Sequence, residues 1–253
     1  MPVRVFDIVN AGPRHRFCTA NFVAHNCLGL GYGCGWHKFA TFAEQLLSPE
    51  VYEKVFGAEL EKGDIERFVA ALNRSKNNEE QLVEFQNASE SKKRYWVNSW
   101  KQVDDYRKNN PANVNLWSGL DAAFKLADGK PEFTVELPSG RILRYKQPKS
   151  YGGSSALIPR LGKLMRTKVY GGLITENITQ ATARDVFADC LLRLEKAGYE
   201  VILHVHDEAV CLVDEDKAEE AKHAIEKIMS TPPEWMSELP QAAEAKITKA
   251  YTK

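Results

Sequence analysis

The chain has 253 residues, with 34 basic and 34 acidic side chains, and 43% of its residues are hydrophobic. These values are typical of a globular protein of one or two domains with a substantial core. No apolar run approaches the roughly 18 residues of a membrane-spanning helix, and the N-terminus lacks the apolar stretch of a signal peptide, so we expect a cytoplasmic protein with no membrane partner.

The first half of the chain is predicted to begin with strands and to continue mostly as helices. Alternating apolar and polar residues predict short strands within residues 3–9 and 22–24, with a turn between them. A glycine-rich segment at residues 28–35 precedes a helical pattern from about Trp36 to Leu47. Residues 64–109 and 115–127 favour further helices. Residues 133–137 and 141–145 flank Pro138-Ser139-Gly140, which predicts a hairpin.

The neutral total charge conceals a basic segment. Residues 132–170 contain eight basic and two acidic side chains, a net charge of +6. Such a segment is typical of a solvated surface or of a surface that binds nucleic-acid phosphates. The neutral total therefore does not exclude nucleic acid as a partner.

The sharpest feature lies near the C-terminus, after a helix that is predicted over residues 177–197. Apolar strands at residues 199–205 and 209–213 enclose His206-Asp207-Glu208, and an amphipathic helix follows to about Met229. This pattern predicts a buried hairpin with two carboxylates at its tip, where a divalent cation would offset the cost of burying them. An exposed turn is the alternative. A zinc site at His204 and His206 lacks a third ligand at the expected spacing.

The surrounding sequence resembles a known enzyme family. The segment from Tyr170 to Asp185, followed by a helix and the carboxylate hairpin, closely resembles the C-terminal palm region of family A (polymerase I-like) DNA polymerases in their bacteriophage form. The resemblance implies an α/β (α+β) fold, with helical fingers and an antiparallel palm sheet. It implies template-directed nucleotidyl transfer in DNA replication, with Mg²⁺ as cofactor.

The resemblance also assigns roles to individual residues. It implies that Asp207 is a catalytic metal ligand, that Glu208 is a supporting carboxylate and that His206 lies near the primer terminus. Asn177 and Gln180 would contact the minor groove of the duplex. The related single-subunit RNA polymerases carry Ser at the position of Glu208, which favours DNA synthesis here.

The glycine-rich segment is similar to the second half of the fingers-helix motif of the same family. Tyr32 and Gly33 then correspond to residues beside the templating base, and Leu28 to an aromatic residue that recognises the incoming sugar. The triphosphate-binding Lys of the motif would fall eight residues before Tyr32, where this chain has Ala24. The family's other metal-binding aspartate lies upstream of this motif. A dinucleotide-binding loop is excluded because the glycines do not follow the G-x-G-x-x-G spacing.

The first residues resemble the two C-terminal blocks of an intein, the self-excising element of protein splicing. In this chemistry Asn26 would cyclise, His25 would polarise the scissile bond and Cys27 would be the accepting thiol. The resemblance to these intein blocks implies that Asp7 and His15 assist the splicing reaction. The alternative is a β-hairpin leader in which the sequence His25-Asn26-Cys27 occurs by accident.

These resemblances divide the chain into an intein segment at residues 1–26, a fingers and connecting helical region at 27–169, and a C-terminal palm region at 170–253. The expected partners are an N-terminal polymerase half that carries the rest of the intein, primer-template DNA and dNTPs. The Mg²⁺ site would be shared with that half, so we expect no polymerisation by this chain alone. The alternatives are an inactive nucleic-acid-binding remnant and a single-subunit RNA polymerase fragment.

The cysteines and tryptophans receive structural roles. Five cysteines without a CxxC pair favour a reducing compartment. We expect Cys34, Cys190 and Cys211 to be small buried hydrophobic residues and the five tryptophans to be core anchors rather than base-stacking platforms.

Overall fold

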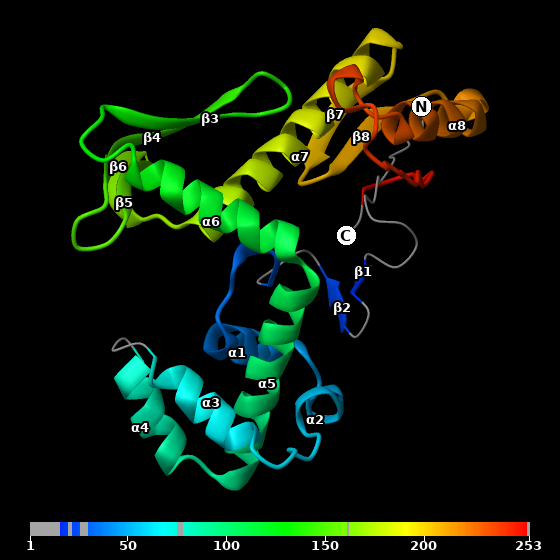
Figure 1. Ribbon diagram of the computed structural model, residues 1–253. Coiled ribbons are helices and arrows are strands. Elements are labelled where there is room, and N and C mark those ends of the chain that lie inside the picture. The colour runs from blue at the N-terminus through cyan, green and yellow to red at the C-terminus, as the bar shows by residue number, and fades with distance from the viewer. Residues whose placement is uncertain (1–15, 20–21, 26–29, 75–77, 161, 252–253) are drawn as a thin grey trace. The chain divides into compact units, whose positions relative to one another are not determined.

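The computed structural model describes residues 16–19, 22–25, 30–74, 78–160 and 162–251 (Figure 1). Two compact units divide this part of the chain. The helical unit comprises residues 28–123 and 170–173. The mixed unit takes its described residues from 1–27, 124–169 and 174–253.

The helical unit consists of short helices that surround one long helix. Its elements are η2 (Leu30–Tyr32), α1 (Trp36–Leu46), α2 (Pro49–Phe56), α3 (Asp64–Leu72), α4 (Glu79–Asn87), α5 (Glu90–Asn109) and most of α6 (Pro111–Lys125). Ser48 and Ser89 cap α2 and α5, since each side chain accepts a hydrogen bond from a backbone N–H in the first turn. The helices predicted in this region are confirmed.

Aromatic side chains form the core of the helical unit. Phe68 is fully buried and packs edge-to-face against Trp36 and Phe85, with ring centroids 4.9 and 4.8 Å apart. Trp96 lies in the same cluster. Trp96 and Trp117 are buried, which confirms the structural role expected for these two tryptophans.

The mixed unit contains a four-stranded antiparallel sheet in the order β3-β4-β5-β6 (Figure 1). The strands are β3 (Glu132–Glu136), β4 (Ile142–Lys149), β5 (Ser155–Arg160) and β6 (Lys163–Lys168). The predicted hairpin is β3–β4, and it is confirmed. Tyr145 on β4 is buried and contacts the rings of Phe124 and Phe133, so this side of the sheet faces the core.

The C-terminal part of the mixed unit packs a helical pair against a hairpin. Its elements are α7 (Gly171–Lys196), β7 (Glu200–Val205), β8 (Glu208–Leu212), η4 (Glu215–Lys217), α8 (Ala218–Ser230) and η5 (Glu234–Met236). The core joins Phe187, Cys190 and Leu194 of α7 to Cys211 of β8 and Ile225 of α8. Helix α7 begins six residues before the predicted start at residue 177.

A second short hairpin lies near the N-terminus, where β1 (Arg16–Thr19) pairs with β2 (Phe22–His25). The strand expected at residues 22–24 is confirmed, and the one expected at 3–9 lies outside the described residues. The described chain has eight α-helices and antiparallel sheets of four and two strands, which confirms the α+β class. None of the helices in the described ranges is both long and apolar enough to cross a membrane.

Candidate functional site

The carboxylates of the predicted site lie at the turn of the β7–β8 hairpin. Val205 pairs with Glu208, which leaves His206 and Asp207 as a two-residue loop. His206 has φ = +54°, a conformation that such turns usually assign to glycine. His is among the non-glycine residues that adopt positive φ more often than most, and a two-residue hairpin turn requires such a conformation. The turn places Asp207 in solvent and Glu208 at the start of β8.

The two strands differ in burial, so the expectation of a buried hairpin is right for β8 and wrong for β7. Ala209, Val210 and Cys211 have at most 1% exposure, whereas Ile202 and Leu203 are 45% and 42% exposed. A bulge between Val201 and Leu203 interrupts the register of β7. The apolar run of β7 forms an exposed strand because helices α7 and α8 cover β8 instead.

Two contacts define the surroundings of the carboxylates. The Tyr251 hydroxyl donates a hydrogen bond to Oε2 of Glu208 at 2.9 Å. Asp207 borders a cavity of about 20 Å³ whose other walls include Phe187, Cys190 and Gln241. Sequence reasoning did not find Tyr251, because a contact across 43 residues leaves no local pattern.

The cysteines near the hairpin are packing residues, as expected. Burial raises the pKa of the Cys190 thiol and raises that of Cys211 to about 12, so both are neutral at physiological pH. Cys34 in the helical unit is also buried, and burial raises its pKa. None of these thiols has the low pKa that a nucleophile or metal ligand requires.

The predicted minor-groove residues lie on α7. Nδ2 of Asn177 donates to the Tyr145 hydroxyl at 2.8 Å, and Nε2 of exposed Gln180 donates to Oε1 of Glu176 at 3.2 Å. Burial raises the pKa of Tyr145, against a smaller opposing effect of the Asn177 hydrogen bond. Tyr145 was not identified from the sequence, and it fixes one side of the Asn177 amide.

A second set of contacts ties the β3–β4 turn to the same helix. Nε of Arg141 lies 2.8 Å from Oδ1 of Asp185, and Ser139 donates to the other oxygen of that carboxylate. Arg141 also donates to the Ala181 carbonyl at 2.9 Å. These bonds hold the hairpin against the middle of α7.

The predicted template-binding residues Tyr32 and Gly33 lie in the helical unit. Gly33 has φ = +74° and closes the η2 turn through a hydrogen bond to the Leu30 carbonyl at 3.2 Å. Nε1 of Trp117 donates to the Gly31 carbonyl at 3.1 Å. The turn also meets the first residues of α7, because a side chain on Gly172 would overlap the Tyr32 carbonyl. This turn is therefore held by packing on two helices.

The predicted splicing residues are mostly outside the description. His25 is the last residue of β2. Asp7, His15, Asn26 and Cys27, together with Leu28 of the glycine-rich segment, lie outside the described residues.

The donor set at the hairpin suits a hard cation. Mg²⁺ is usually bound by one or two carboxylates together with waters and substrate phosphates, and Asp207 and Glu208 provide such oxygens. In the described ranges, no three His, Cys, Asp or Glu side chains cluster as metal ligands. The hairpin therefore fits part of a Mg²⁺ site and does not fit the three-ligand zinc site considered at His204 and His206.

Comparisons with known proteins point to the same enzyme class. The chain is 45% identical over 127 residues to a protein described as a DNA polymerase from Bacillus phage SP02. The match covers 47% of this chain and 19% of that protein, so the chain corresponds to less than a fifth of its relative's length. No family model matches the chain. The chain is thus similar, over part of its length, to a phage DNA polymerase.

Proposed function

We propose that this chain is the C-terminal part of a family A DNA-directed DNA polymerase. The observation that carries the proposal is the His206-Asp207-Glu208 turn, which places the Asp207 carboxylate in solvent at the end of a hairpin. The partial similarity to a phage DNA polymerase supports it. The reaction would join the primer 3′-oxygen to the α-phosphorus of a dNTP and release pyrophosphate.

The carboxylates have distinct proposed roles. Asp207 is a ligand of catalytic Mg²⁺, which would stabilise charge on the attacking and leaving oxygens. Glu208, oriented by the Tyr251 hydroxyl, supports that site, and His206 lies near the primer terminus. The remaining ligands belong to an N-terminal partner.

The other proposed contacts are with DNA and nucleotide. Asn177 and Gln180 reach the minor groove, where amide groups can donate to base acceptors. Tyr32 and Gly33 lie beside the templating base, and Leu28 lies near the sugar of the incoming nucleotide. Residues 27–169 would then form fingers and a connecting region, and 170–253 the palm.

We further propose that residues 1–26 are the C-terminal segment of a split intein. Asn26 cyclises and releases the segment, His25 polarises the bond that breaks, and Cys27 carries the incoming N-terminal half before the new peptide bond forms. Asp7 and His15 assist. Splicing would supply the missing lysine and the first metal-binding aspartate.

Primer extension with Mg²⁺, after the chain is combined with a candidate N-terminal half, tests the polymerase assignment. Asp207→Ala should lower the rate at least about 100-fold, the range for loss of a group that stabilises developing charge. Asp216→Ala is the matched control, because Asp216 is an exposed carboxylate in η4. Extension that is unaffected by Asp207→Ala would contradict the role of this residue.

The same assay separates the alternatives. Incorporation of ribonucleotides in preference to dNTPs would indicate an RNA polymerase fragment. DNA binding without extension by the reconstituted protein would indicate an inactive remnant.

Splicing is tested on a denaturing protein gel, where the ligated product is a larger polypeptide than either half. The product should form when the two halves are mixed and should be absent from a variant with Asn26→Ala and Cys27→Ala. Ligation by that variant would refute the splicing mechanism. His25→Ala should slow the release of residues 1–26, because His25 polarises the bond that breaks. His223→Ala is its control, because His223 is an exposed residue of α8 without a proposed role.

A further inference from the structure

One face of the four-stranded sheet is exposed and basic. Tyr145 and Ala156 are buried on the opposite face, with 3% and 0% exposure. The strand register aligns Lys146 with Leu157 and Arg166, and Lys149 with Ser155 and Lys168. Residues directly opposite each other on neighbouring strands share a face. Arg144 is exposed on the same face, two residues before Lys146, and is paired with Glu132. We call the other four exposed cations of this face the basic sheet face: Lys146, Lys149, Arg166 and Lys168.

Acidic side chains in the described part of the chain offset only some of this charge, and Asp128 interacts electrostatically with Lys149. Glu132 is aligned with Lys146, but its carboxylate forms an ion pair with Arg144. Glu136, at the far end of β3, is aligned with Ile142. Arg166 donates to the Gln147 carbonyl at 2.7 Å, which fixes its guanidinium beside β4. Four cations on β4 and β6, the two strands that flank β5, form a surface suited to several phosphates of one polyanion.

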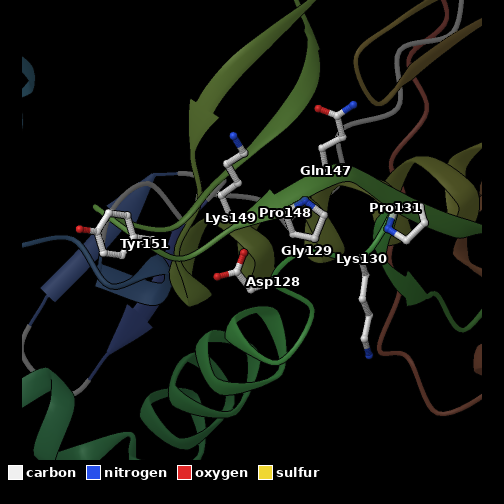
Figure 2. A pocket seen from close by; sticks show the side chains of 8 residues that line it. All are labelled: Asp128, Gly129, Lys130, Pro131, Gln147, Pro148, Lys149 and Tyr151. Atoms are coloured by element: carbon white, nitrogen blue, oxygen red, sulfur yellow. The ribbon is translucent and has the colours of Figure 1, made fainter.

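An open pocket adjoins the basic sheet face where β4 departs from regular pairing. Its volume is about 630 Å³, and its lining includes Asp128, Lys130, Gln147, Lys149 and Tyr151. Figure 2 shows Lys130 and Lys149 extending in opposite directions, with Tyr151 at one end of the row of labelled side chains. Tyr151 is 98% exposed, so its ring can stack on a planar ligand.

The Asp128 carboxylate in the pocket lining favours a base over a phosphate. Oδ2 of Asp128 accepts a hydrogen bond from the Ser150 hydroxyl at 2.5 Å, and this bond holds the pKa of the carboxyl below its ordinary value. A carboxylate repels phosphate but accepts hydrogen bonds from the amino groups of bases. Phosphates would therefore lie along the lysines, and a base beside Tyr151.

We propose that the basic sheet face and its pocket bind a single DNA strand, with phosphates on the four cations and one base stacked on Tyr151. Exposed bases favour a single strand over a duplex, whose bases are already stacked and paired. The inference extends the proposed polymerase function to a template-strand contact away from the carboxylate hairpin. A binding assay with the full chain tests this contact without polymerisation. Single-strand binding and the proposed polymerase function can therefore fail independently of each other.

Binding of a fluorescent oligothymidine provides the first test. The combined variant Lys146→Glu, Lys149→Glu and Lys168→Glu leaves Arg166 and its structural hydrogen bond intact. We expect at least about 10-fold weaker binding. The slope of the logarithm of the binding constant against the logarithm of the salt concentration should become shallower by about two, since each single-strand phosphate contact contributes roughly 0.7 to it. The control reverses the charge of three exposed lysines elsewhere in the mixed unit: Lys227, Lys246 and Lys249. Equal weakening by both variants would overturn the proposal.

Tyr151→Ala provides the second test, since a ring that is almost fully exposed can be removed without loss of the fold. It should weaken binding of the oligothymidine about 5-fold or more and leave binding of a duplex of equal length unchanged. Asp207→Ala should bind the oligothymidine normally. Equal loss for duplex and single strand, or equally tight binding of polyglutamate, would refute single-strand recognition.

Discussion

Asp64, the first residue of α3, has no exposed side-chain surface and is held by several donors. Nζ of Lys101 lies 2.7 Å from Oδ2, and the Glu61 backbone N–H donates to the same oxygen at 3.0 Å. Burial alone raises the pKa of Asp64, but the hydrogen bonds from Lys101, Glu61 and Arg67 outweigh it and hold the pKa below its ordinary value. The carboxylate is therefore charged at neutral pH and stabilises the helical unit.

Asp64→Asn should lower the free energy of unfolding by about 2 kcal/mol near neutral pH, because charge-assisted hydrogen bonds are lost. The folded-state pKa is lowered, so the stabilisation is present above the unfolded-state pKa of about 3.9 and is lost as the pH falls through the folded-state value. Denaturant unfolding, followed by tryptophan fluorescence, should show a smaller difference at acidic pH. Asp104→Asn is the control, because Asp104 forms an exposed pair with Lys108 on α5, and such pairs contribute little to stability. A difference that does not change with pH would contradict this role of Asp64.

At the scale of elements, the start of α7 depends on two glycines. A methyl group on Gly171 would overlap the Trp117 carbonyl, and one on Gly172 would overlap the Tyr32 carbonyl. Gly172→Ala should therefore destabilise the helical unit by about 1–3 kcal/mol through overpacking. Gly119→Ala is the matched control in α6, where nothing lies within 4 Å, and it should stabilise by up to about 1 kcal/mol. Thermal melts should show a lower melting temperature for Gly172→Ala and an equal or higher one for Gly119→Ala. A lower melting temperature for both variants would refute the packing explanation.

The same glycines illustrate which parts of the structure local sequence patterns cannot predict. Local patterns predicted α1, α8 and the β3–β4 and β7–β8 hairpins, because periodicity and turn residues act over short distances. They placed the start of α7 at residue 177, since Gly171-Gly172 reads as a helix breaker until its close neighbours are known. Strands β5 and β6 were missed, because Pro159 and the lysines weaken a strand pattern. The hairpin tip was found from residue types, but the Tyr251 contact depends on the fold.

At the scale of the molecule, each unit has its own hydrophobic core. Phe68 and Trp96 lie in the core of the helical unit, and Leu194 and Ile225 lie in that of the mixed unit. Trp36, Trp96, Trp100 and Trp117 belong to the helical unit, and Trp235 belongs to the mixed unit. Tryptophan fluorescence therefore reports mainly on one unit, whereas far-ultraviolet circular dichroism reports on both.

Two separate cores predict that the chain does not unfold in one cooperative step. Leu194→Ala, which removes a fully buried side chain from the mixed unit, should cost about 2–5 kcal/mol there. It should shift the transition seen by circular dichroism and leave the fluorescence midpoint almost unchanged. Phe68→Ala should shift the fluorescence midpoint, and with it the part of the circular dichroism transition that comes from the helical unit, at a cost of about 3–5 kcal/mol. If Leu194→Ala moves both signals equally, the two cores unfold together, and the prediction of separate unfolding is wrong.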